Sequence, residues 1–193
     1  MRSSMASNEV RIISGLWKGR KLRFNTTADL RPSLGRVRET LFNWLVADLP
    51  GAHCLDLFAG SGALGFEALS RGAASVTFVE KNRQAAASLR DNARLLQAQQ
   101  ASVRATSAQQ FLRAKPARPW DIIFFDPPFA DADVAPLLER LLQAAYLQPD
   151  GIIYIERSRR EPLPFPEQLY KQGQAGDCHF GLLAPTPAPQ TPP

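Results

Sequence analysis

The sequence predicts an α/β fold built on a mostly parallel sheet. From residue 53 onward, short apolar runs alternate with segments in which apolar residues recur at helical spacing. Strands that alternate with helices form right-handed crossover units, and these place helices on both faces of the sheet. The 193 residues, of which 45% are hydrophobic, suffice for one domain with a single buried core and a small attachment.

Residues 10–50 are expected to form a small N-terminal module of a hairpin and a helix. Two short runs alternate apolar with basic residues, which predicts a β-hairpin with one apolar and one basic face. The apolar positions are Val10, Ile12, Leu22 and Phe24. Trp17 lies at the predicted tip. A loop is expected over residues 25–35, and apolar residues at helical spacing from Val37 to Leu45 then predict a helix that packs on the main domain.

The main domain is expected over residues 51–183. Its predicted strands cover residues 53–58, 75–79, 101–104, 121–125 and 151–155, with weaker signals at 168–171 and 179–183. Its predicted helices cover residues 63–71, 108–113 and 134–142, together with one that is capped by Asn82 and reaches Leu96. Residues 1–9 and the proline-rich residues 184–193 are expected to be disordered tails.

The net charge of +5 is concentrated near the N-terminus. Residues 10–40 carry eight Lys and Arg side chains against two acidic ones, a net charge of +6. Such a stretch is typical of a surface that binds a polyanion, and it is equally compatible with an ordinary solvated surface. The basic residues are Arg11, Lys18, Arg20, Lys21, Arg23, Arg31, Arg36 and Arg38.

The composition argues against several other classes of protein. No apolar stretch approaches the roughly 20 residues that span a bilayer, and the first residues lack the apolar run of a secretory signal. Cys54 and Cys178 are far apart in apolar segments, which favours two reduced, buried thiols. His53 and His179 lack metal-ligand spacing, so no metal site is expected. We therefore expect a cytoplasmic protein that does not bind membranes.

A glycine pattern indicates a cofactor site. Gly60, Gly62 and Gly65 form G-x-G-x-x-G between a predicted strand and a predicted helix, and Glu80 ends the next strand. In open sheets of this kind, ligands bind at the carboxyl ends of the strands, where the glycine turn and the acidic residue meet. A carboxylate in that position can accept hydrogen bonds from ribose hydroxyls. The pattern fits NAD and S-adenosylmethionine about equally well, since both contain an adenosine.

A second motif, Asp126-Pro127-Pro128-Phe129, follows the fourth predicted strand and lies on the same edge. Consecutive prolines fix φ and remove backbone donors, so the carbonyl groups remain available as rigid acceptors. An amino group on an aromatic base is a poor nucleophile until its hydrogens are held. Asp126 and the Pro127 carbonyl can each accept one hydrogen, and Phe129 can stack on the base. A base within folded RNA must be extruded to reach such a site.

Together with the N-terminal segments, these motifs resemble the RsmD family of bacterial 16S ribosomal RNA guanine-N2 methyltransferases. The resemblance rests on residues 11–22, 30–32, 36–45, 56–72 and 126–129. It implies a Rossmann-like class I S-adenosylmethionine-dependent methyltransferase fold, with a seven-stranded, mostly parallel sheet, a reversed final strand and a small N-terminal hairpin and helix. The implied reaction methylates the amino group of the guanine numbered 966 in 16S rRNA. The substrate would be an assembled or assembling 30S particle, and the enzyme would be a monomer.

The resemblance also implies roles for individual residues. The guanine amino group would be held by Asp126, Pro127, Pro128 and Phe129. The cofactor would be held by Asp56, Phe58, Ala59, Gly60, Ser61, Gly62, Gly65, Glu80, Lys81, Ser107 and Ala108. RNA would be held by Arg11, Trp17, Lys18, Arg20, Lys21, Arg31, Arg36 and Arg38. The chain departs from the usual pattern at Ser107, where many methyltransferases have an acidic or amide side chain, and at Gly35, where the family often has an acidic residue.

Three alternatives remain at the level of the sequence. A DNA adenine-N6 methyltransferase uses the same Asp-Pro-Pro-aromatic chemistry, although the chain has no room for a separate sequence-reading domain. An NAD-dependent dehydrogenase requires a proton-transfer residue near the cofactor, and none is evident at the strand ends. A non-catalytic RNA-binding assembly factor would not need Asp126 and the intact glycine turn.

Overall fold

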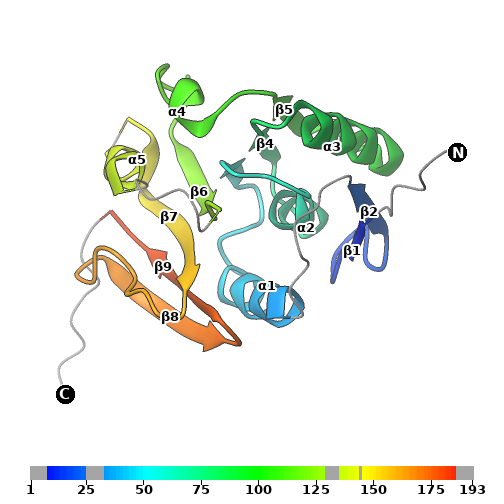
Figure 1. Cartoon of the computed structure of the whole chain (residues 1–193). Helices are drawn as coiled ribbons and strands as arrows, with labels where there is room; N and C mark the ends of the chain where they lie inside the picture. The colour runs from blue at the N-terminus through cyan, green and yellow to red at the C-terminus, as the bar shows by residue number, and fades with distance from the viewer. Residues whose placement is uncertain (1–7, 25–32, 129–134, 144, 186–193) are drawn as a thin grey trace, which may run out of the picture.

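The computed structural model describes residues 8–24, 33–128, 135–143 and 145–185. A seven-stranded sheet with the order β5-β4-β3-β6-β7-β9-β8 forms its centre (Figure 1). The strands are β3 (His53–Asp56), β4 (Ser75–Val79), β5 (Ala101–Arg104), β6 (Trp120–Phe125), β7 (Leu147–Ser158), β8 (Leu169–Ala175) and β9 (Cys178–Leu183). β9 is antiparallel to both of its neighbours, while the other pairings within this sheet are parallel. The expected mostly parallel sheet with a reversed final strand is confirmed.

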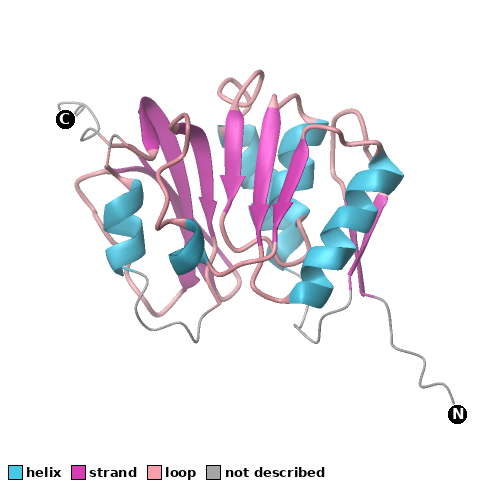
Figure 2. Cartoon of the chain, turned by 90° about the horizontal axis from the view of Figure 1, so that it is seen from above, coloured by secondary structure: helices cyan, strands magenta, loops and turns pink. Residues whose placement is uncertain are grey.

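Helices cover both faces of the sheet, as Figures 1 and 2 show. The helices are α1 (Ser33–Trp44), α2 (Ala63–Ser70), α3 (Arg83–Leu96), α4 (Ala108–Phe111) and α5 (Ala135–Leu141). Alternate residues of each strand point to opposite faces. In β6, Phe124 therefore packs in the core beneath α1, α2 and α3, whereas Phe125 packs in the core beneath α4 and α5. The apolar character of both positions follows from burial on both faces.

The N-terminal hairpin consists of β1 (Asn8–Arg11) and β2 (Lys21–Phe24), which pair antiparallel as the sequence predicts. Leu22 and Phe24 are buried, while Lys21 and Arg23 are exposed. The hairpin shares the core beneath α1, α2 and α3. The buried Asn92 on α3 binds the backbone of Arg23, because its Oδ1 accepts from the Arg23 N–H at 3.1 Å and its Nδ2 donates to the Arg23 carbonyl at 2.9 Å. This contact satisfies backbone groups of β2 that would otherwise lack a partner on that side.

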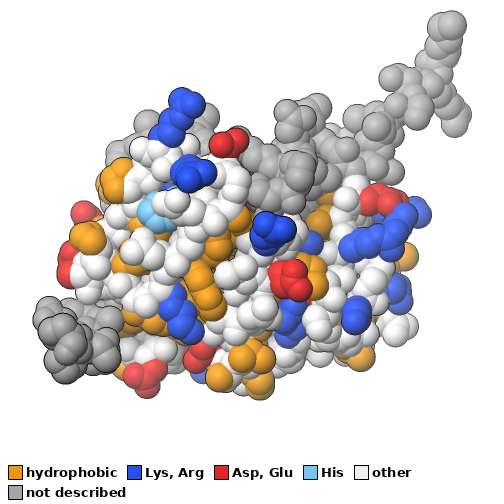
Figure 3. Space-filling model, turned by 90° about the horizontal axis from the view of Figure 1, so that it is seen from below, with side chains coloured by type: hydrophobic (Ala, Val, Ile, Leu, Met, Phe, Trp, Pro, Cys, Tyr) orange, Lys and Arg blue, Asp and Glu red, His pale blue; other side chains and the backbone are white. Residues whose placement is uncertain are grey.

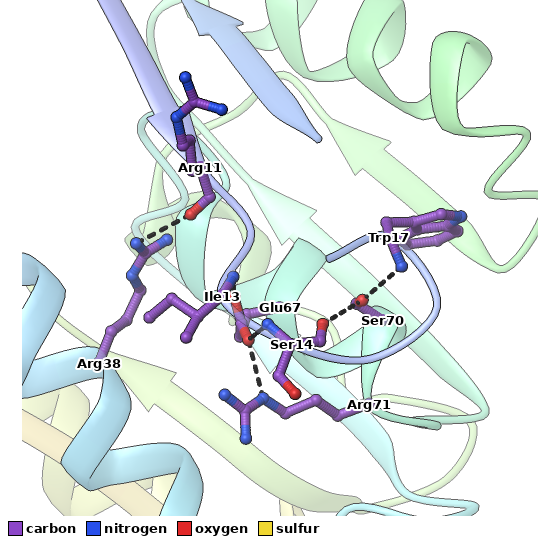
Figure 4. Close-up of polar contacts among 8 residues, drawn as sticks. All are labelled: Arg11, Ile13, Ser14, Trp17, Arg38, Glu67, Ser70 and Arg71. Atoms are coloured by element: carbon purple, nitrogen blue, oxygen red, sulfur yellow. Dashed lines mark hydrogen bonds and ion pairs between the residues drawn. The ribbon is translucent and has the colours of Figure 1, made fainter. Parts of the chain in front are cut away.

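A buried carboxylate on α2 attaches the hairpin to the main sheet. Glu67 has no exposed surface and accepts hydrogen bonds from the N–H groups of Ile13 (2.7 Å) and Ser14 (2.9 Å) and from Arg71 Nε (2.8 Å). Figure 4 shows these donors converging on one side chain. A buried charge is tolerated only when donors compensate it in this way. The segment after β1 is therefore fixed on α2.

The connection after Ser14 lies against the end of the same helix. Ser70 Oγ donates to the Ser14 carbonyl at 2.6 Å and accepts from the Trp17 N–H at 2.9 Å. Gly15 has φ +81°, and a Cβ at this position would lie 1.9 Å from the Ser70 carbonyl oxygen. Only glycine fits both the backbone conformation and the close approach. The predicted hairpin tip is therefore seated on α2.

Most predicted elements occur within a few residues of their expected limits, and two differ. The predicted loop over 25–35 is shortened, because α1 begins at Ser33; residues 25–32 lie outside the described residues. β7 begins at Leu147 instead of residue 151, because a register shift beside Trp120 and Ile122 accommodates the Pro149-Asp150 segment. Asn82 caps α3 as predicted, accepting from the N–H groups of Gln84 and Ala85. Within the described residues, none of the helices combines the length and apolarity of a membrane span.

Removing the Glu67 carboxylate should destabilise the protein strongly. The substitution Glu67→Ala leaves the Ile13 and Ser14 N–H groups and the Arg71 side chain without their acceptor, so we expect the free energy of unfolding to fall by about 3–5 kcal/mol. Urea unfolding measures this change. The exposed Glu139 on α5 provides a matched control, since Glu139→Ala should change stability by less than about 0.5 kcal/mol. Equal effects of the two substitutions would contradict the role assigned to Glu67.

Candidate active site

A cavity of about 160 Å³ lies where β3 and β6 end. The chain order of the strands reverses direction at this pair, and open α/β sheets have their ligand crevice at such a point. Residues from the hairpin, α1, the glycine turn, β6 and β7 line the cavity. They are Val10, Val37, Arg38, Asp56, Phe58, Ala59, Gly60, Ser61, Ala63, Leu64, Asp126, Tyr154 and Glu156. Residues of the glycine turn and Asp126 of the second motif thus line the same cavity.

The glycine turn and Glu80 are directly joined. The Gly60 N–H donates to Glu80 Oε2 at 2.9 Å, and the Asn82 N–H donates to Glu80 Oε1 at 2.7 Å. Gly60 has φ +50°, and among the described residues a Cβ there would have only the Phe58 carbonyl oxygen, at 3.9 Å, within contact distance. The space in front of Gly60 is therefore open to a ligand, and the Glu80 carboxylate is held at its edge.

The other two glycines of the motif serve packing. A Cβ on Gly62 would lie 2.5 Å from Leu89 Cδ2, and one on Gly65 would lie 2.3 Å from Phe78 Cε1. Gly62 and Gly65 therefore let α2 approach α3 and the sheet closely, and neither lines the cavity. The sequence pattern alone did not separate this packing role from ligand contact.

Asp56 ends β3 and is 3% exposed. Its Oδ2 accepts from the Gly65 N–H at 3.1 Å. Burial raises the pKa of Asp56 from 3.8 to about 7; the Gly65 hydrogen bond opposes the shift and the Glu80 charge adds to it. A carboxyl with this pKa beside a cavity can gain its charge when a cationic group is bound next to it.

Asp126 lies in the cavity wall directly after β6, as predicted. Pro127 is buried and Pro128 is exposed, and Phe129 lies outside the described residues. The backbone of β6 reaches β3 at this edge, where the Leu57 N–H donates to the Phe124 carbonyl at 3.1 Å. The pairing of β3 with β6 therefore fixes Asp126 and the glycine turn at the same edge of the sheet.

Sequence reasoning missed Tyr154 and Glu156 on β7. Tyr154 Oη donates to Glu156 Oε2 at 2.8 Å, and both side chains are buried in the cavity wall. Because Phe125 pairs with Ile155, Glu156 lies beside Asp126 on the neighbouring strand. Burial and the nearby Glu156 charge raise the pKa of Tyr154. In the sequence, Glu156 follows the apolar residues 152–155 much as Glu80 follows the apolar end of β4, and this signal could have identified it.

Four further residues predicted to bind the cofactor, Glu80, Lys81, Ser107 and Ala108, lie outside the cavity lining. Lys81 is exposed next to Glu80. Ser107 is the N-cap of α4 and accepts from the Gln110 N–H at 3.2 Å, while Ala108 is buried. Ser107 and Ala108 follow β5, which neighbours β4 and Glu80 in the sheet. They therefore share the edge of the sheet on which Glu80 lies.

The hairpin carries an exposed basic surface, which we define as Arg11, Lys18, Arg20, Lys21 and Arg23. Figure 3 shows basic side chains gathered over this side of the molecule. Lys21 and Arg23 share the acidic partner Glu9, at 2.6 and 3.7 Å. Exposed ion pairs of this kind are weak, so both cations remain accessible to a polyanion.

Other predicted RNA contacts have different surroundings. Arg36 is exposed on α1, and Arg31 lies outside the described residues. Trp17 is partly buried and packs against the core, so its ring is not displayed at a free tip. Arg38 is buried and lines the cavity, which removes it from the exposed surface to which it was assigned. The helical position of Arg38 was correctly predicted, but its direction depends on how α1 packs.

The described residues contain no cluster of metal-ligating side chains. Cys54 and Cys178 are both buried and are not joined in a disulfide, as expected. Burial raises the pKa of the Cys54 thiol far above its ordinary value, so this group is not a reactive thiolate. His53 interacts with Ser75 Oγ at 2.8 Å.

The substitution Asp56→Asn should remove a pH-dependent loss of stability. Because the folded pKa is raised from 3.8 to about 7, the folded protein retains a proton that the unfolded chain releases. The contribution of Asp56 to the free energy of unfolding is fully present below about pH 4. It falls by about 4 kcal/mol as the pH rises to about 7. The variant should therefore be as stable as the native chain near pH 4 and more stable than the native chain at pH 8. Urea unfolding at both pH values tests this, and a constant difference would refute it.

Comparisons with known proteins show the family to which the chain belongs. The family described as Conserved hypothetical protein 95 matches residues 10–183. Ribosomal RNA small subunit methyltransferase D of Haemophilus influenzae is 44% identical over 182 residues, 92% of this chain and 94% of that protein. The protein of the same name from Escherichia coli is 44% identical over 179 residues, 91% and 90% of the two chains. The solved yhhF protein of Escherichia coli, 39% identical, superposes with a TM-score of 0.82 over 94% of this chain and all of that one. The chain therefore belongs to the RsmD family of ribosomal RNA small subunit methyltransferases.

Proposed function

We propose that this protein transfers a methyl group from S-adenosylmethionine to the exocyclic amino group of a guanine in small-subunit ribosomal RNA. Following the family resemblance, the target is the guanine numbered 966 of 16S rRNA, within an assembled or assembling 30S particle. The observation that carries the proposal is the single cavity that contains both the glycine turn and Asp126. Family membership supports the same reaction class.

The residues around the glycine turn fit S-adenosylmethionine. The open space at Gly60 and the Glu80 carboxylate suit a ribose, and Asp56, with its raised pKa, suits a neighbouring ammonium group. When bound, the cofactor supplies an electrophilic methyl group on a sulfonium. The protein positions this group, and positioning accounts for a large part of the acceleration of a two-reactant displacement.

Asp126 is the residue that orients the substrate amino group. Its carboxylate accepts one hydrogen of the amino group, and the Pro127 carbonyl accepts the other. The nitrogen lone pair is then withdrawn from the aromatic ring and would form a bond to the methyl carbon as the carbon–sulfur bond breaks. S-adenosylhomocysteine would leave, and the nitrogen would lose one of its two hydrogens as a proton to the Asp126 carboxylate or to water. Pro127 and Pro128 keep this segment out of a helix, because neither has a backbone N–H.

Glu156 favours guanine over adenine as the substrate base. Guanine carries two adjacent donors on one edge, the ring N1–H and the N2 amino group, whereas adenine presents an amino group beside an acceptor nitrogen. Asp126 directly follows β6 and Glu156 lies on the paired strand β7, each one position beyond the pair Phe125 and Ile155, and both line the cavity. Two acceptors side by side match guanine and leave an unfavourable contact with adenine N1. This arrangement counts against the DNA adenine-N6 alternative.

Methyl transfer into undermethylated small ribosomal subunits tests the proposed function directly. Labelled S-adenosylmethionine and nucleoside mass spectrometry should detect N2-methylguanosine. Label on adenine would instead support the DNA or RNA adenine alternative. Absence of label on particles, naked RNA and DNA would support a non-catalytic assembly factor.

Substitutions of Asp126 separate chemistry from cofactor binding. Asp126→Ala removes an acceptor for the amino group and should lower the single-turnover rate roughly 100- to 1,000-fold. Its affinity for S-adenosylhomocysteine should stay within about threefold of the native value, since the ligand's own contacts lie on the glycine turn. Asp126→Asn keeps one acceptor oxygen and should lose less activity than Asp126→Ala. A large loss of cofactor affinity in either variant would contradict the assigned role.

The basic surface of the hairpin should determine the salt dependence of RNA binding. Each phosphate contact contributes about 0.7–0.9 to the slope of log K against log salt concentration. Lys18→Ala with Arg20→Ala should therefore weaken binding and flatten the slope by up to about 1.8, as measured by filter binding at several salt concentrations. Arg113→Ala with Arg118→Ala removes two exposed charges elsewhere and serves as the control. An equal slope for the two double variants would exclude the hairpin as the RNA contact.

A further inference from the structure

Arg38 has two unsatisfied donors in the wall of the cavity. It lies on α1 and is 7% exposed. Its Nη2 donates to the Arg11 carbonyl at 3.0 Å, whereas Nε and Nη1 are buried and have no hydrogen-bond partner among the described residues. Buried donors without acceptors cost folding free energy, and a native protein retains them where a ligand supplies the acceptor.

The carboxylate whose charge acts on Arg38 is already engaged elsewhere. Burial lowers the pKa of Arg38 below its ordinary value, the Glu67 charge opposes this shift, and the Arg71 charge adds to it. The Glu67 oxygens accept from Ile13 N–H, Ser14 N–H and Arg71 Nε, as Figure 4 shows. Arg38 in the same figure reaches toward Arg11 instead. Among the described residues, the remaining donors of Arg38 therefore have no acceptor, and a ligand in the cavity can supply one.

The charges of the cavity indicate which ligand supplies that acceptor. Its described lining contains one guanidinium, of Arg38, and three carboxyl groups, of Asp56, Asp126 and Glu156. An α-amino acid carries a carboxylate and an ammonium on the same carbon, so it complements a lining of mixed sign. An RNA phosphate would approach three carboxyl groups and would have to enter a cavity of about 160 Å³.

We propose that Arg38 binds the α-carboxylate of the methionine part of the cofactor through Nε or Nη1. These two groups point to different sides of the planar guanidinium, so one of them binds one carboxylate oxygen in a charge-assisted hydrogen bond. The inference rests on the proposed function and deepens it: α1 is part of the cofactor site, and Arg38 does not contact RNA. The hairpin contributes by fixing the third donor group of Arg38 on the Arg11 carbonyl.

Two ligands that differ only in the carboxylate test this assignment. S-adenosylhomocysteine carries the α-carboxylate, and its decarboxylated analogue retains the amine and the adenosine. Calorimetry on the full chain should show that the native protein prefers S-adenosylhomocysteine. Arg38→Met should lower affinity for S-adenosylhomocysteine about 10- to 100-fold and leave affinity for the analogue within about twofold. Arg38→Lys keeps the charge without the planar guanidinium group. Its loss of affinity for S-adenosylhomocysteine should be intermediate.

Arg94→Met is the matched control, since it removes an arginine whose side chain is 76% exposed on α3. It should retain the native preference, and thermal unfolding verifies that the Arg38 variants are folded. If Arg38→Met retains the native preference, or loses affinity for both ligands equally, Arg38 does not recognise the carboxylate and the inference fails while the proposed function stands. If the native protein binds neither ligand, the proposed function fails as well.

Discussion

The buried Glu67 carboxylate is the contact on which the shape of the site depends. It lies without exposed surface on α2 and binds two backbone N–H groups of the segment that follows β1. A buried charge without these hydrogen bonds would be strongly unfavourable, so the position of the hairpin on α2 is fixed. Val10 and Arg11 are then placed at the cavity, where Val10 forms part of its wall and the Arg11 carbonyl binds Arg38. One buried ion therefore organises a wall built from three separate elements.

The cavity combines groups that are costly to bury. Asp56 retains its proton to about pH 7 because it is buried, and the Arg38 guanidinium keeps two donors unsatisfied among the described residues. Both costs decrease when a ligand brings a cation to the first and an anion to the second. We therefore expect cofactor binding to stabilise the fold as well as to supply the methyl group. The same reasoning separates the cavity from the hairpin surface, whose cations are exposed and can meet RNA phosphates.

The sequence predicted the architecture because its signals are local. Strand and helix periods, the Asn82 cap and the alternating hairpin residues each depend on neighbours within a few positions. The two motifs at the ends of β3 and β6 were placed together because parallel strands bring their carboxyl ends to one edge. Limits such as the start of β7 were less accurate, because a register shift with β6 decides them.

The sequence by itself determined the mostly parallel sheet, the glycine turn with Glu80, and the position of Asp126 on the same edge. Only the tertiary structure decided which face of α1 Arg38 occupies, that Glu156 lies beside Asp126, and that Gly62 and Gly65 serve packing. Those properties depend on contacts between residues far apart in the chain. In the sequence, Arg36 and Arg38 are two similar arginines of one predicted helix. The packing of α1 against the hairpin and the sheet leaves Arg36 exposed and buries Arg38.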